Sequence, residues 1–413
     1  MGLKRPRQAP PRLLLPFLAL FAGLSPGCTQ PWRPVTWLEG LRVLAIRAEP
    51  PDLAPGEQTA LTALVVDPRS PTRESTLLWL SCDPDPLALD QPTCAQFATL
   101  QEADELVAGA TLPEGVKPLG LGATVLYQAP ADVFGHLAAD DLRRRRGVIA
   151  MVVLVAVAEA PPAGIPTEDD VKALLKRVQD QLVDSVLAVK RLRISEDQPL
   201  NLNPQIQGIR FGEELWGPGV HPIKLRPGTT ADVVGVAVDG SAQHFVQIDP
   251  DGQSIEKDEK LFFSWFSTAG SFEASRSEEG LAYQTFTPPN LFDAMPPDRS
   301  ATLWVVMRDG RGGVDWQPRS AFFCDPFLAA ARVDAISPAS GPTATIVTLR
   351  GAGLEGVLDV QVGAAWLANL HYQAGTDVLT GFISSETPAG TQQVTVRGKS
   401  CLPDSQTSFE VTR

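Results

Sequence analysis

Short apolar runs separated by turns rich in proline, glycine and aspartate follow one another along most of the chain. Examples are "TLLWLSC", "TVLYQAP", "LFFSWFS" and "ATLWVVMRDG". Runs of this length, bounded by turn residues, are typical of strands packed in two facing sheets. We therefore expect a mainly β protein built of tandem β-sandwiches.

The order of the runs is repeated once. In the first copy, "LAPGEQTALTALVVDP" precedes a run with Trp79, then "TVLYQAP" and "GVIAMVVLVAVA". In the second, "LRPGTTADVVGVAVD" precedes a run with Trp265, then "YQTFTPP" and "ATLWVVMRDG". An immunoglobulin-like sandwich packs its sheets around a tryptophan on a central strand. Both copies, at residues 40–198 and 199–326, resemble that architecture, without the inter-sheet cysteine pair of antibody domains.

The first copy is longer and carries one predicted helix. In "TEDDVKALLKRVQDQLVDSVL", Thr167 and Asp170 resemble a capping box, and apolar residues recur at helical spacing. These apolar residues are Val171, Leu174, Leu175, Val178, Leu182 and Val186. We expect this helix, inserted in the first sandwich, to dock on a sheet edge.

The last segment, residues 331–413, has the most specific pattern. Its features are Pro338, the Gly341-Pro342 turn, a strand followed by "RGAGL", Val362-Gly363, and Pro388 to Gly390 before a closing strand. This set resembles the IPT/TIG domain, an immunoglobulin-like module. The resemblance implies a β-sandwich that serves as a spacer or binding unit, and it identifies no reaction.

The first residues have the layout of an export signal. A basic start with Lys4, Arg5, Arg7 and Arg12 precedes the apolar run "LLLPFLALFAGL" and the sequence "SPGC". As a helix, the apolar run would span about 18 Å, short of the roughly 30 Å hydrocarbon core of a bilayer. "LSPGC" resembles a bacterial lipobox, whose cysteine, Cys28 here, is lipidated and becomes the mature N-terminus.

The resemblance implies a signal peptide at residues 1–27 and a lipid-anchored tether at 28–39. Thr29 follows the cysteine, in place of the aspartate associated with inner-membrane retention in enteric bacteria, so we expect the outer membrane of a bacterial cell envelope. Ordinary secretion and an uncleaved membrane anchor are the alternatives.

Four cysteines remain if Cys28 is lipidated, and an even number in an oxidising compartment indicates two disulfides. Three pairings are possible. Cys82 and Cys94 flank a turn-rich stretch, and Cys324 and Cys401 bracket the last segment, so we favour these two pairs. No cysteine and histidine spacing typical of a zinc or haem site occurs, and we predict no metal and no cofactor.

Charge and motifs narrow the function classes. The chain has 35 Lys and Arg against 48 Asp and Glu, a formal net charge of -13. Nucleic-acid binding needs a basic surface, so we expect no nucleic-acid partner. The four histidines are scattered, and no GxSxG, HExxH or P-loop signature occurs, so we expect a protein that is not an enzyme.

Two charged clusters have both a functional and an ordinary interpretation. "DPDGQSIEKDE" from Asp249 has the carboxylates of a calcium loop, but placing Gly252 at the loop glycine puts Gln247 at the first ligand position. We favour a turn joining the strands "HFVQI" and "KLFFSWF". The run "RRRR" at Arg143 to Arg146 could bind an anionic polysaccharide or a lipid head group. We favour the other interpretation, a solvated turn whose charges protect the next strand from aggregation.

The candidate partner surface is the loop of residues 83–93, with Asp83, Asp85 and Asp90 as its contact residues. A loop closed by a disulfide loses less conformational freedom on binding than an open loop. Trp216 and Trp316 lie in turn-rich contexts, where an exposed indole can stack on a sugar or anchor a partner. Packing in a core or between domains is the alternative for both.

Two functions fit these observations. The first is a cell-envelope lipoprotein that acts as a non-catalytic structural, spacer or binding protein, with an envelope protein or a polysaccharide as its partner. The second is a carbohydrate-binding or carbohydrate-active envelope protein with the sandwiches as accessory modules. Once the leader, the two sandwiches and the last module are assigned, no stretch of catalytic-domain size is left, which favours the first.

Overall fold

The computed structural model describes residues 34–69, 74–85, 93–94, 115–161, 168–197, 199–217, 221–278, 284–292 and 294–413. The chain divides into two units, Met1–Pro34 and Val35–Arg413, and all that follows concerns the second. The predicted signal peptide, the lipidation site Cys28 and the contact residue Asp90 lie outside the described residues.

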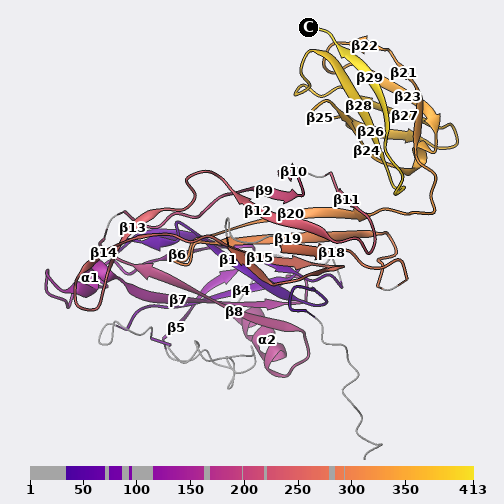
Figure 1. The fold of residues 1–413 in the computed structure, drawn as a ribbon. Helices are drawn as coiled ribbons and strands as arrows, with labels where there is room; N and C mark the ends of the chain where they lie inside the picture. Colours follow the sequence, from indigo (N-terminus) through magenta and orange to yellow (C-terminus); the bar gives the residue numbers. More distant parts are fainter. Residues whose placement is uncertain are drawn as a thin grey trace, which may run out of the picture. The chain divides into compact units, whose positions relative to one another are not determined.

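The first sandwich has two facing sheets (Figure 1). One sheet contains β1 (Arg42–Glu49), β3 (Gln58–Val66) and β6 (Thr124–Gln128). The other has the order β2 (Asp52–Leu53), β8 (Ser185–Ile194), β7 (Val148–Val157), β4 (Thr76–Cys82), β5 (Val116–Leu121). Trp79 is fully buried between them against Leu61, Tyr127 and Leu154, and its indole N–H donates to the carbonyl of Gly122 at 2.8 Å.

The second sandwich repeats this plan. One sheet has the order β10 (Glu214–Trp216), β9 (Ile206–Phe211), β12 (Ala231–Ala237), β18 (Gln284–Thr287), β16 (Ser271–Phe272). The other has the order β11 (Ile223–Leu225), β20 (Val314–Phe323), β19 (Ser300–Arg308), β15 (Phe262–Ser267), β17 (Arg276–Glu278). Trp265 on β15 occupies the place that Trp79 occupies on β4.

The last sandwich contains the C-terminal strands. One sheet has the order β21 (Arg332–Ser337), β23 (Ile346–Ala352), β27 (Val378–Phe382), β26 (Ala368–Gln373). The other has the order β22 (Ser340–Gly341), β29 (Ser405–Val411), β28 (Gly390–Gly398), β24 (Val357–Val362), β25 (Ala365–Trp366), with a 3-10 turn at Leu354–Gly356. Val347, Leu349, Val360 and Phe409 are buried in its core.

All three sandwiches share one crossover between their sheets. In each, a short strand near the start moves to the opposite sheet and pairs in parallel with the last strand: β2 with β8, β11 with β20, and β22 with β29. In the second sandwich, β10 precedes this short strand and pairs with β9. All the other ladders are antiparallel among the described residues. This is the arrangement of an immunoglobulin-like sandwich. The predicted mainly β fold of tandem immunoglobulin-like sandwiches is confirmed, while the predicted domain limits stay predictions.

The first sandwich carries the predicted helix, α2 (Glu168–Gln179), with two differences from the prediction. α2 packs on the outer face of a sheet, not on an edge: Leu174, Leu175 and Val178 cover side chains of β4 and β7. β7 is therefore buried on both faces, which explains its unbroken apolar run. Figure 1 shows α2 beside β8.

The helix is also shorter than predicted. It ends at Gln179 because Gln181 adopts a left-handed conformation (φ 53°) and the N–H of Leu182 returns to the carbonyl of Arg177 at 2.9 Å. This is a Schellman-type end, usually made with glycine. Leu182 is consequently exposed, and Val186 lies in β8.

The arginine cluster forms a short helix, α1 (Leu142–Arg146), in place of the favoured turn. The Asp141 side chain caps its first turn by accepting the N–H of Arg143 at 2.9 Å. Arg143 pairs with Asp141, Arg144 with Glu196 at 2.7 Å, and Arg145 with Asp197 at 3.7 Å. Most of the positive charge is therefore matched within the fold.

The acidic loop is a hairpin turn, but it joins a different pair of strands from the predicted pair. It connects β13 (His244–Ile248) to β14 (Ser254–Asp258), and β15 follows separately. The Asp249 carboxylate accepts the N–H groups of Asp251 and Gln253. Within the described ranges, no group of three or more His, Cys, Asp or Glu side chains is placed to hold a metal ion.

Both favoured disulfides are present. Cys82 and Cys94 are bonded with their Cα atoms 5.8 Å apart, and Cys324 and Cys401 with theirs 4.9 Å apart. The second bond joins the end of β20 to the turn between β28 and β29, so it links the second sandwich to the last. No helix in the described part of the chain is long and apolar enough to cross a membrane.

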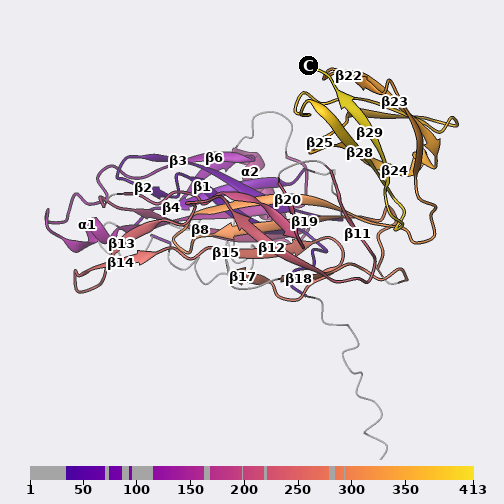
Figure 2. The same ribbon diagram turned by 45° about the horizontal axis from the view of Figure 1, so that its top comes forward.

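The first two sandwiches stack through the outer faces of their sheets. Leu44 and Leu64 from the first contact Trp304, Val306 and Trp316 from the second, in an apolar cluster separate from the two cores. β1 lies beside β19 and β20 in both Figure 1 and Figure 2.

The end of the predicted tether joins the same layer. Leu38 donates its N–H to the carbonyl of Ser267 at 2.8 Å, and Ser267 donates to that of Thr36 at 2.9 Å.

Candidate functional site

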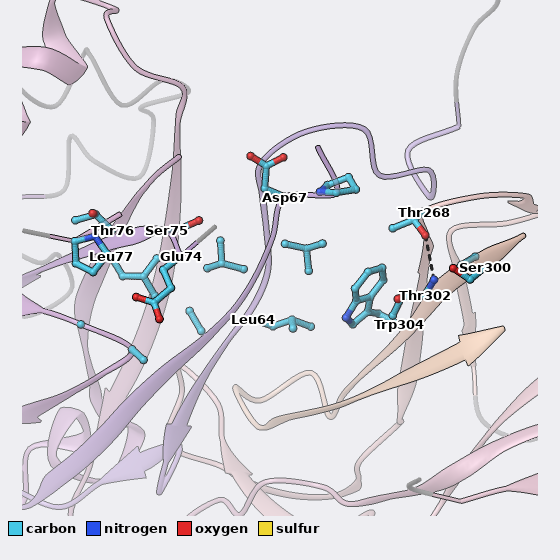
Figure 3. A pocket seen from close by; sticks show the side chains of 18 of the residues that line it. Leu64, Asp67, Glu74, Ser75, Thr76, Leu77, Thr268, Ser300, Thr302 and Trp304 are labelled. Carbon is cyan, nitrogen blue, oxygen red and sulfur yellow. Dashed lines mark hydrogen bonds between the residues drawn. The ribbon is translucent and has the colours of Figure 1, made fainter. Parts of the chain in front are cut away.

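A wide groove of about 1000 Å³ opens beside β3, where the first two sandwiches meet. Its floor is residues 63–66 of β3, followed by Asp67 and Pro68. One wall comes from residues 74–77, which lead into β4, and from residues 121–123, at the end of β5 and in the turn to β6. The other wall belongs to the second sandwich and includes Thr268, Asp298, Ser300, Thr302 and Trp304. We call this the β3 groove; Figure 3 shows it from close by.

The floor of the groove is a strand edge with no ladder partner among the described residues. β1 pairs with β3 as far as Val66, but β6 pairs only from Gln58 to Thr62. Past Thr62, the backbone of β3 therefore faces the groove on its β6 side. The turn before β6 bends away, because the N–H of Gly122 donates to the carbonyl of Leu77 on β4 at 3.0 Å.

The side chains of this edge are apolar on both faces of the sheet. Ala63 and Val65 pack against the core of the first sandwich, and Leu64 and Val66 pack against the cluster between the sandwiches. All four remain half-buried, since the groove exposes their edge. Figure 3 shows Leu64 between Leu77 on one side and Trp304 on the other, so the groove surrounds the strand edge on both sides.

Hydroxyl groups and carboxylates line the walls. Thr302 donates its backbone N–H to the Thr268 hydroxyl at 3.0 Å, and Thr76 donates its hydroxyl to the carbonyl of Glu159 at 2.8 Å. The Ser300 hydroxyl donates to the Asp298 carboxylate, and this bond lowers the pKa of Asp298.

The charge of the groove is negative. Its carboxylates are Asp67, Glu74 and Asp298, and of these Asp67 pairs with Arg69 at 2.9 Å. Neither lysine, arginine, histidine nor cysteine occurs among the described lining residues. These side chains are suited to hydrogen bonding and to attracting positive charge.

The base of the predicted partner loop is held by the first sandwich. The Asp83 carboxylate accepts the Tyr127 hydroxyl at 2.9 Å and the Lys117 ammonium at 2.5 Å. Burial and the Asp83 charge raise the pKa of Tyr127. A hollow of about 280 Å³ lies there, lined by Asp83, Lys117 and His136 among others. Asp85 is described but residues 86–92 are not, so the contact role of the loop stays a prediction.

The two candidate tryptophans take part in packing. Trp316 lies against the apolar cluster between the first two sandwiches. Trp216 lies 6.3 Å from Trp366 of the last sandwich, centroid to centroid, and the guanidinium carbon of Arg397 is 4.9 Å from the centroid of the Trp216 ring. Packing in a core or between domains is the alternative that the sequence analysis gives for both residues. Their role as partner anchors stays a prediction.

Arg397 also fixes the junction with the last sandwich. It pairs with the buried Asp359 at 3.0 Å and donates to the carbonyl of Pro222 at 2.7 Å. Burial raises the pKa of Asp359 to about 6, against the opposing charge of Arg397. Lys224 reaches Asp404 at 2.5 Å across the same junction. Together with the Cys324–Cys401 bond, these contacts hold the last two sandwiches together.

A buried polar cluster fixes the first two sandwiches at the β19–β20 turn. The Asp309 carboxylate, 3% exposed, accepts the N–H groups of Arg311, Gly312 and Gly313 at 2.7–3.0 Å and the side-chain amide of Asn201 at 2.7 Å. Lys190 from β8 donates to the carbonyl of Gly312. Burial lowers the pKa of Lys190 to about 8, which the charge of Asp309 partly offsets.

Sequence reasoning did not find the β3 groove. One local signal was available: the four consecutive apolar residues 63–66 break the alternation of a strand that has one wet face. The groove also depends on where β6 ends, and on contacts between two domains, which no local pattern encodes.

Comparisons with known proteins are limited to structures. No protein-family model matches the chain, and no curated protein sequence matches it. SGBP-B from a complex xyloglucan utilization locus in Bacteroides uniformis is 14% identical over 50% of this chain and 49% of that one, with a TM-score of 0.18. The chain thus spans about half the length of that protein.

Two further structures are similar over most of this chain. SGBP-B of the Bacteroides ovatus mixed-linkage glucan utilization locus, in complex with a mixed-linkage heptasaccharide, is 10% identical over 91% of this chain and 70% of that one, with a TM-score of 0.17. The three N-terminal domains of the bacteriophage RB49 outer capsid protein Hoc are 9% identical over 91% and 100%, with a TM-score of 0.19. At these scores, the assignment of the fold rests on the sheet topology above.

Proposed function

We propose that this chain is an exported, lipid-anchored and non-catalytic binding protein of the bacterial cell envelope, with the β3 groove as its ligand site. The observation that carries the binding role is the open edge of β3 beside a groove with hydrogen-bonding walls. A strand edge left without a partner is a template for association, and folded proteins usually cover or charge it. The IPT/TIG resemblance of residues 331–413 and the outer-membrane location belong to this proposal.

The rigid joints support a role in holding this site in place. The buried cluster around Asp309 fixes the first two sandwiches, and the Cys324–Cys401 bond with the Arg397 contacts fixes the last two. A covalent bond and buried hydrogen-bond networks between domains restrict hinge motion. A binding protein gains from such joints because less freedom is lost when the ligand binds.

Polysaccharide binding is the second candidate function. The groove is lined by hydroxyl side chains at Ser75, Ser300 and Thr302, by carboxylates at Glu74 and Asp298, and by Trp304. Together they offer the hydrogen-bonding and apolar contacts that sugars use.

The anchor proposal is tested by fractionation. We expect the Cys28→Ala chain to move from the membrane pellet to the soluble fraction, because two acyl chains supply roughly 0.8 kcal/mol per buried methylene and the variant has none. The Thr29→Ala chain, which keeps the cysteine, should stay in the pellet. A wild-type protein that is soluble, or whose mature N-terminus by mass spectrometry is not Cys28, contradicts the anchor.

The ligand site is tested by filling the groove. The Ser75→Trp chain, immobilised and incubated with envelope extract of the producing bacterium, should capture at least about tenfold less of the polysaccharide or protein that the wild type retains. The Ser408→Trp chain, with the same substitution at an exposed position on β29 of the last sandwich, is the matched control and should capture as much as the wild type. Equal capture by all three chains contradicts the site, and turnover of any polysaccharide or peptide contradicts the non-catalytic role.

A further inference from the structure

We infer that the ligand of the β3 groove is an extended polypeptide segment that adds as a strand to the free edge of β3, with basic side chains facing Glu74 and Asp298. This inference rests on the proposed function and names its ligand class.

The edge of β3 is already held in the geometry that an added strand needs. Residues 63–66 all pair with β1 on their other side, from Arg42 with Val66 to Ile46 with Ala63, with a shift of register on β1 between Val43 and Ala45. The strand is thus extended and fixed before any ligand arrives. Its β6 side has no ladder partner in the described chain past the pair of Thr62 with Thr124. A ligand strand here would continue the line of β6, and four residues would cover about 13 Å of edge.

The shape of the groove matches the alternation of side chains along a strand. Successive side chains of an added strand point to opposite faces of the sheet. One face opens toward Thr76 and Leu77, and the other toward Thr302 and Trp304, as Figure 3 shows. Main-chain hydrogen bonds would supply affinity, and the two sides of the groove would select alternate side chains.

The charge of the walls selects the side chains. Asp67 is already paired with Arg69. Glu74 and Asp298 carry exposed carboxylates, and no lysine, arginine or histidine occurs among the described residues that line the groove. Lysine or arginine side chains on the added strand would therefore be attracted to them. The attraction between such exposed charges is modest and sensitive to salt.

A polypeptide fits this groove better than a polysaccharide for two reasons. A sugar chain has no regular series of N–H and C=O groups to match the edge of β3. In addition, the Trp304 side chain that sugars would stack on is only 9% exposed, so it offers little ring surface for stacking.

The test uses the full Cys28→Ala chain and labelled octapeptides that alternate lysine with valine, leucine or threonine. We expect at least one of these peptides to bind with a Kd of about 100 μM or tighter, and to slow hydrogen exchange of the amides at residues 63–66. N-methylation of the peptide backbone, which keeps the charge but removes donors, should weaken binding at least about tenfold.

Two charge-matched variants complete the test. Glu74→Lys should weaken binding of the lysine peptide, whereas Glu355→Lys, the same charge change at an exposed position in the last sandwich, should not. Equal binding of the N-methylated peptide, equal effects of the two variants, or no binding of any peptide each overturns strand addition.

The outcomes also separate this inference from the proposed function. If no peptide binds but capture from envelope extract is still lost in Ser75→Trp, the groove is a ligand site for another class, such as a polysaccharide. If Ser75→Trp changes neither peptide binding nor capture from envelope extract, both proposals fail.

Discussion

The Trp265→Ala chain should lose about 3–5 kcal/mol of unfolding free energy, because the substitution empties the centre of the second sandwich. The Trp265 side chain is fully buried, and its ring lies 5.4 Å from that of Phe272 and 6.3 Å from that of Phe263, between centroids. Its indole N–H donates to the Ser277 hydroxyl at 2.9 Å, so alanine also removes a buried hydrogen bond.

Urea unfolding of the Cys28→Ala chain, followed by circular dichroism, measures this loss as a fall in the transition midpoint. Trp366→Ala is the control, because that side chain is half-buried and stacks on His221 at 4.0 Å at a junction, outside any core. We expect a clearly smaller effect from it. A loss below about 1 kcal/mol in Trp265→Ala would mean that the sheets do not pack around this ring.

The Asp309→Ala chain should lose a similar amount, about 3–5 kcal/mol, although no core side chain is removed. The alanine removes the acceptor for the N–H groups of residues 311–313 and for the side-chain amide of Asn201. The Gly313 N–H and the Asn201 amide are buried there, and Arg311 and Gly312 are half-buried. It also removes the negative charge near Lys190, whose pKa should fall further below its usual value.

The turn between β13 and β14 offers a matched control. The Asp249 carboxylate accepts backbone N–H groups from two residues of its own turn, and Asp309 accepts them from three of its own, but the Asp249 turn is exposed. Asp249→Ala should therefore cost less than about 1 kcal/mol, since water replaces the lost acceptor. If the two variants were equally destabilised, burial of the Asp309 cluster would not be the cause.

The fold could be predicted from the sequence because its signals are local. Runs with Trp79 and Trp265 mark central strands, and the turn residues between runs mark the hairpins. The disulfides followed from the distribution of the cysteines: Cys82 and Cys94 are 12 residues apart around one turn-rich stretch. The strand order of the last sandwich likewise agrees with the immunoglobulin-like pattern read from residues 331–413.

The details that sequence reasoning missed depend on conformation or on distant contacts. The end of α2 is set by a left-handed Gln181, a residue type that does not signal a helix end as glycine does. The packing of Trp216 and Trp316 depends on domains that meet only in the folded chain. The β3 groove depends on both a local conformation and a distant contact. β6 stops pairing with β3 at Thr62, and residues of β19 in the second sandwich form part of the opposite wall.

The Cys324–Cys401 bond gives the last sandwich a second covalent attachment to the chain. The segment that connects β20 to β21 carries Phe327, whose 79% exposure makes it accessible to a protease that cuts after aromatic residues. A cut there opens the backbone but leaves the C-terminal sandwich tied through the sulfur atoms to the strand that precedes the cut. Shedding of this sandwich into the surroundings therefore requires two events, cleavage and reduction, and a nicked molecule keeps its full mass until a thiol reaches the bond.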